Sequence, residues 1–143
     1  MTEVRRLRRI VAVRTTQRDI CAMRLLQAKQ RTEHAKDQLS QAERQLEEAS
    51  LPPALIGEPL TPMDLERMDA ARIAAWEEIA VWQASKESAE LAEETARTQV
   101  EAQHLRLRQS ERLGERAERS QKQRVSAAEQ QLHDEQASRG GRA

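Results

Sequence analysis

All four prolines of this chain lie between residues 52 and 62, in a window that also contains Gly57. Proline breaks a helix because it lacks a backbone N–H and its ring collides with the preceding turn. The residue before a proline also avoids the helical conformation, so the first helix must stop near Leu51. The sequence therefore predicts one helix over about 2–50, a connection over 51–61, a second helix over about 62–137 and a flexible tail over 138–143.

The composition explains why the segments on both sides of the prolines are helical. The chain has 143 residues, of which 34% are charged, and its aromatic residues are two tryptophans. Such a chain cannot fill a thick core, but it can form long helices that each bury one narrow stripe. We therefore expect a single all-α domain, an antiparallel coiled-coil hairpin with the second helix longer, and not a sheet or a nucleotide-binding α/β domain.

The start of the second helix is marked by four local cues. Thr61 suits the N-cap, Pro62 suits the first helical position, and Asp64 has the place of the acidic residue in a capping box. Leu60 and Leu65 have the spacing of a hydrophobic staple. These cues agree on a helix that begins at residue 62.

The first helix carries a heptad seam. Two series of positions, seven residues apart, are mostly apolar and include many small residues, which permits close helix packing. The series are Val4, Val11, Arg18, Leu25, Thr32, Leu39, Leu46 and Leu7, Arg14, Cys21, Ala28, Ala35, Ala42, Ala49.

The second helix has a less regular pattern. Its predicted seam is Ala70, Ala74, Val81, Ala84, Ser88, Leu91, Thr95, Thr98, Ala102 and Leu105. A hairpin that turns near Ile56 places Leu7 opposite Leu105, Val11 near Val100, Cys21 opposite Leu91, and Leu39 opposite Ile73. The second helix then overhangs the first from about Arg112, and we expect that overhang to fray or to need a partner. A parallel dimer through the first helix's seam is the alternative arrangement.

Charge is sorted along the chain although the net charge is zero. Residues 1–36 hold ten basic and three acidic side chains, residues 37–104 hold five and fifteen, and residues 105–143 hold nine and six. A hairpin would therefore have a basic open end and an acidic end at the turn. These residues are either solvated helix faces or surfaces that dock on opposite charge.

The segment from Leu65 to Trp82 carries more apolar surface than one seam can bury. Its apolar residues, among them Ile73 and Trp76, cover more than half of the helix circumference, whereas a two-helix rod buries a stripe of about 100°. Either the connection, through Leu51, Leu55, Ile56 and Leu60, covers the excess, or this surface binds a protein with a tryptophan as anchor.

The sequence shows no catalytic constellation, so we expect a protein that is not an enzyme and that holds no metal or cofactor. His34, His104 and His133 are far apart, glycine-rich phosphate loops are missing, and Cys21 occupies a seam position. The apolar run after the N-terminal arginines is shorter than a secretory signal requires, and no run could span a bilayer. The expected location is the cytosol.

Three stretches resemble the FliJ/YscO family, the SctO-like central stalk proteins of flagellar and injectisome type III secretion systems. They are Val4–Arg14 (VRRLRRIVAVR), the Ala/Gln/Glu-rich Gln27–Ala49, and the Arg/Lys/Gln-rich Glu111–Gln131. The likeness is one of composition and architecture and spans nearly the whole chain. The first stretch leans toward a virulence-associated injectisome, and the sequence leaves both the injectisome and the flagellar system open.

The resemblance implies a stalk that couples the hexameric secretion ATPase to the cytoplasmic domain of the export gate protein and escorts export chaperones. It implies a cytoplasmic protein peripheral to the inner-membrane export apparatus, which meets the membrane only indirectly. On the residues themselves, we expect no binding of nucleic acid. By position, the ATPase-facing residues would be Arg5, Arg6, Arg8, Arg9, Arg14, Arg106 and Arg108. The export-gate contact would be Trp76, Ile79, Ala80 and Gln83.

Two other functions stay open on the sequence. One is a generic coiled-coil scaffold or export chaperone that dimerises through the seam of the first helix. The other is a basic coiled coil that binds nucleic acid through Arg5, Arg6, Arg8 and Arg9. Interleaved aromatic residues and a known binding motif are both missing, and the domain is neutral, which counts against the second function.

Overall fold

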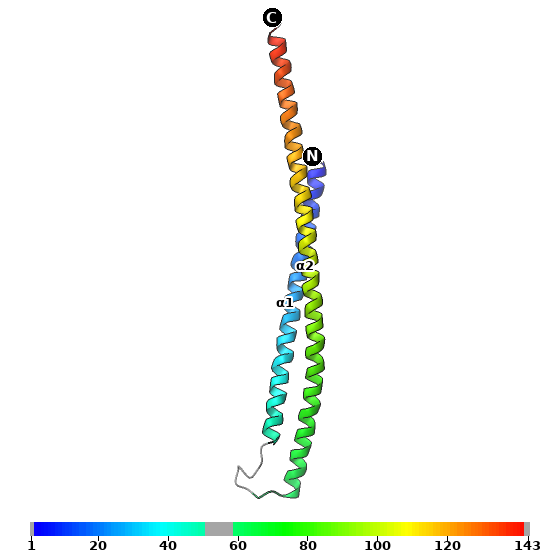
Figure 1. The fold of residues 1–143 in the computed structure, drawn as a ribbon, viewed down its shortest axis with the longest axis vertical. Coiled ribbons are helices and arrows are strands. Elements are labelled where there is room, and N and C mark those ends of the chain that lie inside the picture. Colours follow the sequence, from blue (N-terminus) through cyan, green and yellow to red (C-terminus); the bar gives the residue numbers. More distant parts are fainter. Residues whose placement is uncertain (1, 51–58, 142–143) are drawn as a thin grey trace. The chain divides into compact units, whose positions relative to one another are not determined.

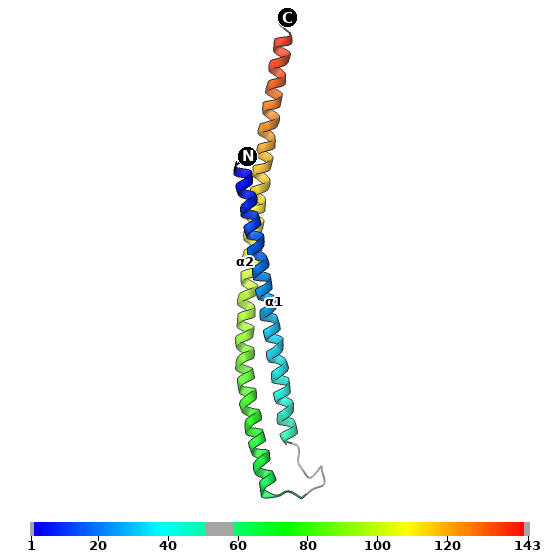
Figure 2. The same cartoon turned by 180° about the vertical axis from the view of Figure 1, so that it is seen from behind.

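A computed structural model describes residues 2–50 and 59–141, which form two long α-helices. Helix α1 is Thr2–Ser50 and helix α2 is Pro62–Gly140, 49 and 79 residues long. They run antiparallel as a hairpin (Figures 1 and 2), so the predicted all-α fold with a longer second helix is confirmed. Both helix starts and the end of α1 agree with the prediction, whereas α2 continues three residues beyond 137 into the expected tail.

The chain divides into two compact units, each built from a segment of both helices. Unit 1 comprises Met1–Cys21 and Gln99–Ala143, and unit 2 comprises Ala22–Thr98. The predicted sorting of charge follows this division: unit 1 contains fifteen basic and nine acidic residues, and unit 2 contains nine basic and fifteen acidic residues. None of the described helices is long and apolar enough to cross a membrane.

The N-terminus of α2 is closed by a capping box, as predicted. The Asp64 backbone N–H donates to Thr61 Oγ1 at 3.2 Å, and the Thr61 N–H donates to Asp64 Oδ2 at 3.1 Å. The reciprocal bonds satisfy two backbone donors that a helix start leaves free. They also lower the pKa of the Asp64 carboxyl, chiefly through the side-chain and backbone hydrogen bonds to Thr61, and Arg67 contributes in the same direction.

The seam of α1 is the one predicted. All fourteen of its positions are buried or half-buried, including the three polar ones, Arg14, Arg18 and Thr32. Thr32 is only 3% exposed. Its hydroxyl donates to the Ala28 carbonyl at 3.1 Å, which satisfies the buried donor within the helix itself. A regular heptad therefore located the buried face of α1 even through its polar interruptions.

The predicted seam of α2 is wrong. Its ten residues are all exposed: Ala70, Ala74, Val81, Ala84, Ser88, Leu91, Thr95, Thr98, Ala102 and Leu105. The buried positions are instead Ala75, Ile79, Ala96, Leu107 and Ser110. Three of these five buried residues are small, which suits close packing against the α1 seam. Larger side chains such as Leu91 are exposed to solvent.

The predicted hairpin register is also wrong. In unit 2, Leu39 and Ala42 form the core cluster with Ile79, and Leu46 and Trp82 pack against it. Ile73, the expected partner of Leu39, is 59% exposed, and Leu105 and Leu91, the expected partners of Leu7 and Cys21, are 60% and 66% exposed. Met63 and Leu65, in the first helical turn of α2, are exposed as well. The observed contacts between α1 and α2 therefore do not fit a hairpin that is symmetric about Ile56.

The overhang of α2 starts later than residue 112. In unit 1, half-buried positions of α2 continue through Gly114, Ala117 and Gln121, and every side chain from 122 to 140 is exposed. Lys122, Val125 and Glu129 still line a hollow together with Val4 and Arg8 of α1, so residues 130–140 are referred to below as the α2 extension. It is helical throughout.

Candidate docking surfaces

Two exposed stripes, one in each unit, stand out on the helices. Among the described residues, no group of three or more His, Cys, Asp or Glu side chains is arranged to hold a metal ion. Cys21 is a free, buried cysteine in the α1 seam. The candidate sites described below are two exposed surfaces.

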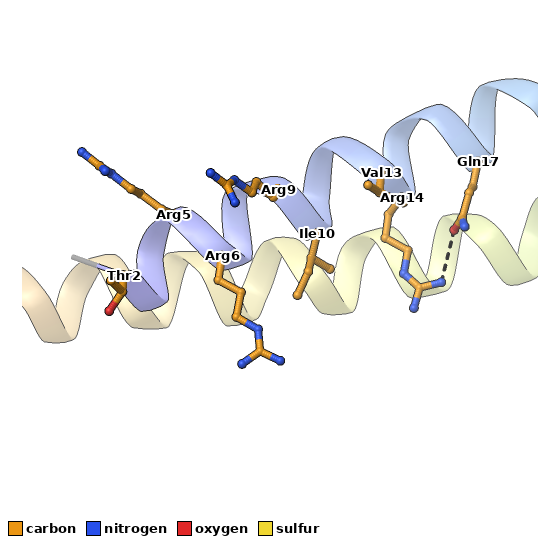
Figure 3. A pocket seen from close by; sticks show the side chains of 8 residues that line it. All are labelled: Thr2, Arg5, Arg6, Arg9, Ile10, Val13, Arg14 and Gln17. Carbon is orange, nitrogen blue, oxygen red and sulfur yellow. Dashed lines mark hydrogen bonds between the residues drawn. The ribbon is translucent and has the colours of Figure 1, made fainter.

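The first surface lies on α1 in unit 1 and is called the arginine face. Side chains of α1 from Thr2 to Gln17 line a shallow open hollow there (Figure 3). Along it, apolar side chains alternate with polar ones at spacings of four and three, which places them on one side of the helix. The arginine face consists of Arg5, Arg6, Arg9, Ile10, Val13, Gln17 and Ile20. Val13 is 56% exposed, Ile20 is 47% exposed and Ile10 is half-buried, so most of the apolar part of the face is open to solvent.

The arginines of α1 differ in their surroundings. Arg8 donates from Nε and Nη2 to Glu118 Oε1 of α2, at 3.2 and 3.0 Å. Arg14 is half-buried and its Nη1 donates to Gln17 Oε1 at 3.2 Å (Figure 3). Arg5, Arg6 and Arg9 are exposed and form no ion pair with another residue of the described chain. These three cations are therefore free to meet an acidic partner.

Arg106 and Arg108 lie on α2 on either side of the buried Leu107. Both are exposed. At about 100° per residue they project on opposite sides of α2. The structure thus places all seven predicted ATPase-facing arginines in unit 1, but it does not gather them on one face.

The second surface lies on α2 in unit 2 and is called the tryptophan stripe. It consists of Ile73, Trp76, Ala80 and Gln83, at spacings of three, four and three. Ile73 is 59% exposed and Trp76 is 61% exposed. The stripe is thus a second helical face beside the seam, with no α1 residue over it, and it accounts for part of the excess apolar surface of this segment.

Among the predicted gate residues, Ile79 has a different environment. It is 6% exposed and belongs to the core cluster with Leu39 and Ala42, whereas Trp76, Ala80 and Gln83 are exposed. Of the residues expected to cover the excess apolar surface, Leu51, Leu55 and Ile56 lie outside the described residues. Leu60 is 45% exposed.

Ile73 completes the stripe but was not among the predicted site residues. The signal that finds it is its distance of three residues from Trp76, which becomes visible once Ala75 and Ile79 are known to be the seam. Ile20 extends the arginine face in the same way, seven residues after Val13. Comparison of the chain with protein-family models, with curated proteins and with solved structures finds no match.

Proposed function

We propose that this protein is a central stalk protein of a type III secretion export apparatus, of the FliJ/YscO kind. In this role it couples the hexameric secretion ATPase to the cytoplasmic domain of the export gate protein and escorts export chaperones. It works in the cytoplasm, peripheral to the inner-membrane apparatus. The proposal rests on the sequence resemblance together with the unequal helical hairpin and its two exposed surfaces.

The observation that carries the proposal is the exposure of Trp76 within a regular stripe. An indole that is 61% exposed on a helix costs solubility and gives the hairpin little stability. Tryptophan is enriched among the residues that dominate binding energy at protein interfaces. Trp76, Ala80 and Gln83 are spaced at four and three residues, which suits contact with one face of a partner. We assign the gate contact to this stripe, with Ile73 in place of the buried Ile79.

The basic character of unit 1 supports an acidic partner at that unit. Arg5, Arg6 and Arg9 are exposed and free of ion pairs within the described chain. Clustered cations speed encounter with an acidic surface and fix the orientation of the complex. We assign the ATPase contact to these arginines, while Arg8 and Arg14 are partly engaged inside unit 1 by Glu118 and Gln17.

The alternative of a parallel homodimer through the α1 seam is less well supported. That seam is buried or half-buried along its whole length within one chain. A parallel dimer would therefore require α2 to leave α1, with loss of the packing around Leu39 and Ile79.

The test is hydrolysis by the secretion ATPase of the same system, with and without this protein. We expect stimulation and a complex at low salt, and loss of both in the Arg5→Glu, Arg6→Glu, Arg9→Glu variant. Trp76→Ala should instead abolish binding to the gate domain and leave ATPase stimulation intact, with Val81→Ala as the matched control on another exposed face of α2. Unchanged hydrolysis and no complex at low salt would contradict the proposal.

A further inference from the structure

The two exposed stripes are complementary to each other, and we infer that the arginine face of one copy docks on the tryptophan stripe of a second copy. This inference does not depend on the proposed secretion function, because it concerns the purified chain alone. The stripes belong to different units. The occupant proposed for each stripe is a second molecule of the same chain, on the grounds of spacing and charge that follow.

The spacing of the two stripes is the first argument. On α1, Ile10, Val13, Gln17 and Ile20 follow one another at three, four and three residues. On α2, Ile73, Trp76, Ala80 and Gln83 follow the same spacing. Side chains with this repeat form a narrow seam of the kind that two helices pack into each other. Each stripe offers three apolar side chains and one glutamine.

The charges at the ends of the stripes are the second argument. Arg6 precedes the apolar segment of α1 and Arg24 follows it. Asp69 precedes the segment of α2 and Glu87 follows it. Each position is four residues from the nearest member of its stripe, so cations bracket one stripe and carboxylates bracket the other. Opposite charges beside an apolar seam select the partner and suppress pairing of like stripes.

The distribution of charge favours an antiparallel contact. Residues 5–9 of α1 contain four arginines and no acid. On α2, residues 84–94 contain four glutamates and one lysine, whereas residues 64–72 contain three acids and two arginines. The strongest basic end therefore matches the acidic end that follows Gln83. In this direction Arg6 lies beside Glu87 and Ile20 lies beside Ile73.

The contact should be weak and open-ended. The two segments are shorter than six helical turns, so we expect them to bury less than the roughly 1,200 Å² at the lower limit of stable interfaces. The arginine face and the tryptophan stripe are different surfaces, so the contact is heterologous and a copy can use both at once. We expect assemblies whose size increases with protein concentration, instead of a single dimer of fixed size.

The experiment is sedimentation velocity of the full chain from low micromolar to near-millimolar concentration, at low and high salt. We expect monomer when dilute, larger species when concentrated, and a return to monomer at high salt. Ile73→Ser should weaken association about tenfold or more, as expected for an interface anchor, while Val81→Ser should not. All these side chains are exposed, and far-UV circular dichroism will verify that the helices persist.

A charge-reversal pair decides whether the two stripes touch each other. Arg6→Glu with Arg9→Glu forms one variant, and Glu87→Arg with Glu90→Arg forms the other. Each alone should remain monomeric at high concentration, and an equimolar mixture should associate again. Lys29→Glu, on the same helix outside the stripe, is the control and should associate like the unaltered chain. A monomer at every concentration, association that survives both reversals, or a mixture that stays monomeric would overturn the inference.

Discussion

His34 of α1 and Trp82 of α2 meet edge to face within unit 2, with ring centroids 5.8 Å apart and ring planes at 85°. Aromatic pairs favour this geometry because the positive edge of one ring faces the negative face of the other. Trp82 also packs against the core cluster, whereas Trp76, six residues earlier, is 61% exposed. The two tryptophans of the chain therefore have different surroundings: Trp82 packs against the core of unit 2, and Trp76 is open to solvent.

Replacing each tryptophan by alanine tests this division. Trp82→Ala should reduce the free energy of unfolding by about 2 kcal/mol, roughly half of the loss for a fully buried tryptophan. Trp76→Ala should change it by less than about 0.5 kcal/mol, as is usual for an exposed side chain. Urea unfolding followed by far-UV circular dichroism measures both. Equal losses in the two variants would mean that Trp76 packs inside the protein.

Gly114 is a site where one added methyl group should stabilise the protein. It lies within α2, and a Cβ atom there would meet no heavy atom within 4 Å. Alanine in a helix interior is favoured over glycine by about 1 kcal/mol, so Gly114→Ala should raise the free energy of unfolding by that amount. Gly140→Ala is the matched control, since its Cβ also meets open space but it ends the helix. A destabilised Gly114→Ala would show that α1 approaches this position closely.

The capping box makes stability depend on pH in a defined direction. The pKa of Asp64 is lowered in the folded chain by its bonds to Thr61, so the carboxylate form is favoured by folding. This contribution is complete above the ordinary pKa of an aspartate and is lost as the pH falls through the lowered value. Thermal melts of the protein and of Asp64→Asn should therefore differ at neutral pH and converge in acid. A difference in melting temperature that persists below that pKa would mean that the charge of Asp64 does not contribute to the difference.

Thr61→Ala tests the other half of the same box. Loss of an N-cap hydroxyl costs about 1 kcal/mol, so this variant should melt earlier at every pH above the Asp64 transition. Thr95→Ala is a suitable control, because its hydroxyl donates to the Leu91 carbonyl inside α2 and caps no helix end. Equal effects of the two variants would show that the Thr61 hydroxyl has no specific value as a cap.

The helix ends and the α1 seam could be predicted because they depend on local chemistry. Proline and the Thr61–Asp64 capping box act on the backbone within a few residues. The helix ends that they determine therefore do not depend on which side chains of α2 pack against α1. The α1 heptad repeats with large and small residues in alternate series. That regularity kept Thr32 on the buried face, where it is 3% exposed, in spite of its polarity.

The α2 seam could not be predicted because two of its faces are similarly apolar. Val81, Leu91 and Leu105 mark one face and are larger than Ala75 and Ala96, which are buried on the other. Apolar content favoured the face with larger side chains, whereas the fit of Ile79 against Leu39 and Ala42 decided the outcome. Such a fit depends on the shape of both helices together. The choice of the wrong face of α2 also gave the wrong predicted pairing between α1 and α2. It put the buried Ile79 among the predicted surface residues.

The α2 extension provides the sharpest test of the corrected register. A chain that stops after Glu129 loses residues 130–140, whose side chains are all exposed, so its melting temperature should stay the same while its helical signal falls. A chain that stops after Glu111 also loses Gly114, Ala117 and the Arg8–Glu118 ion pair.

The chain that stops after Glu111 should be less stable than the full-length protein by about 2 kcal/mol, because Val4 and Leu7 lose the α2 side chains beside them. The register that starts the overhang at residue 112 predicts the same melting temperature for both truncations. Circular dichroism melts of the two chains, taken beside the full-length protein, therefore distinguish the two registers without reference to any partner. A loss of stability already on removal of 130–140 would show that α1 or another segment covers the extension.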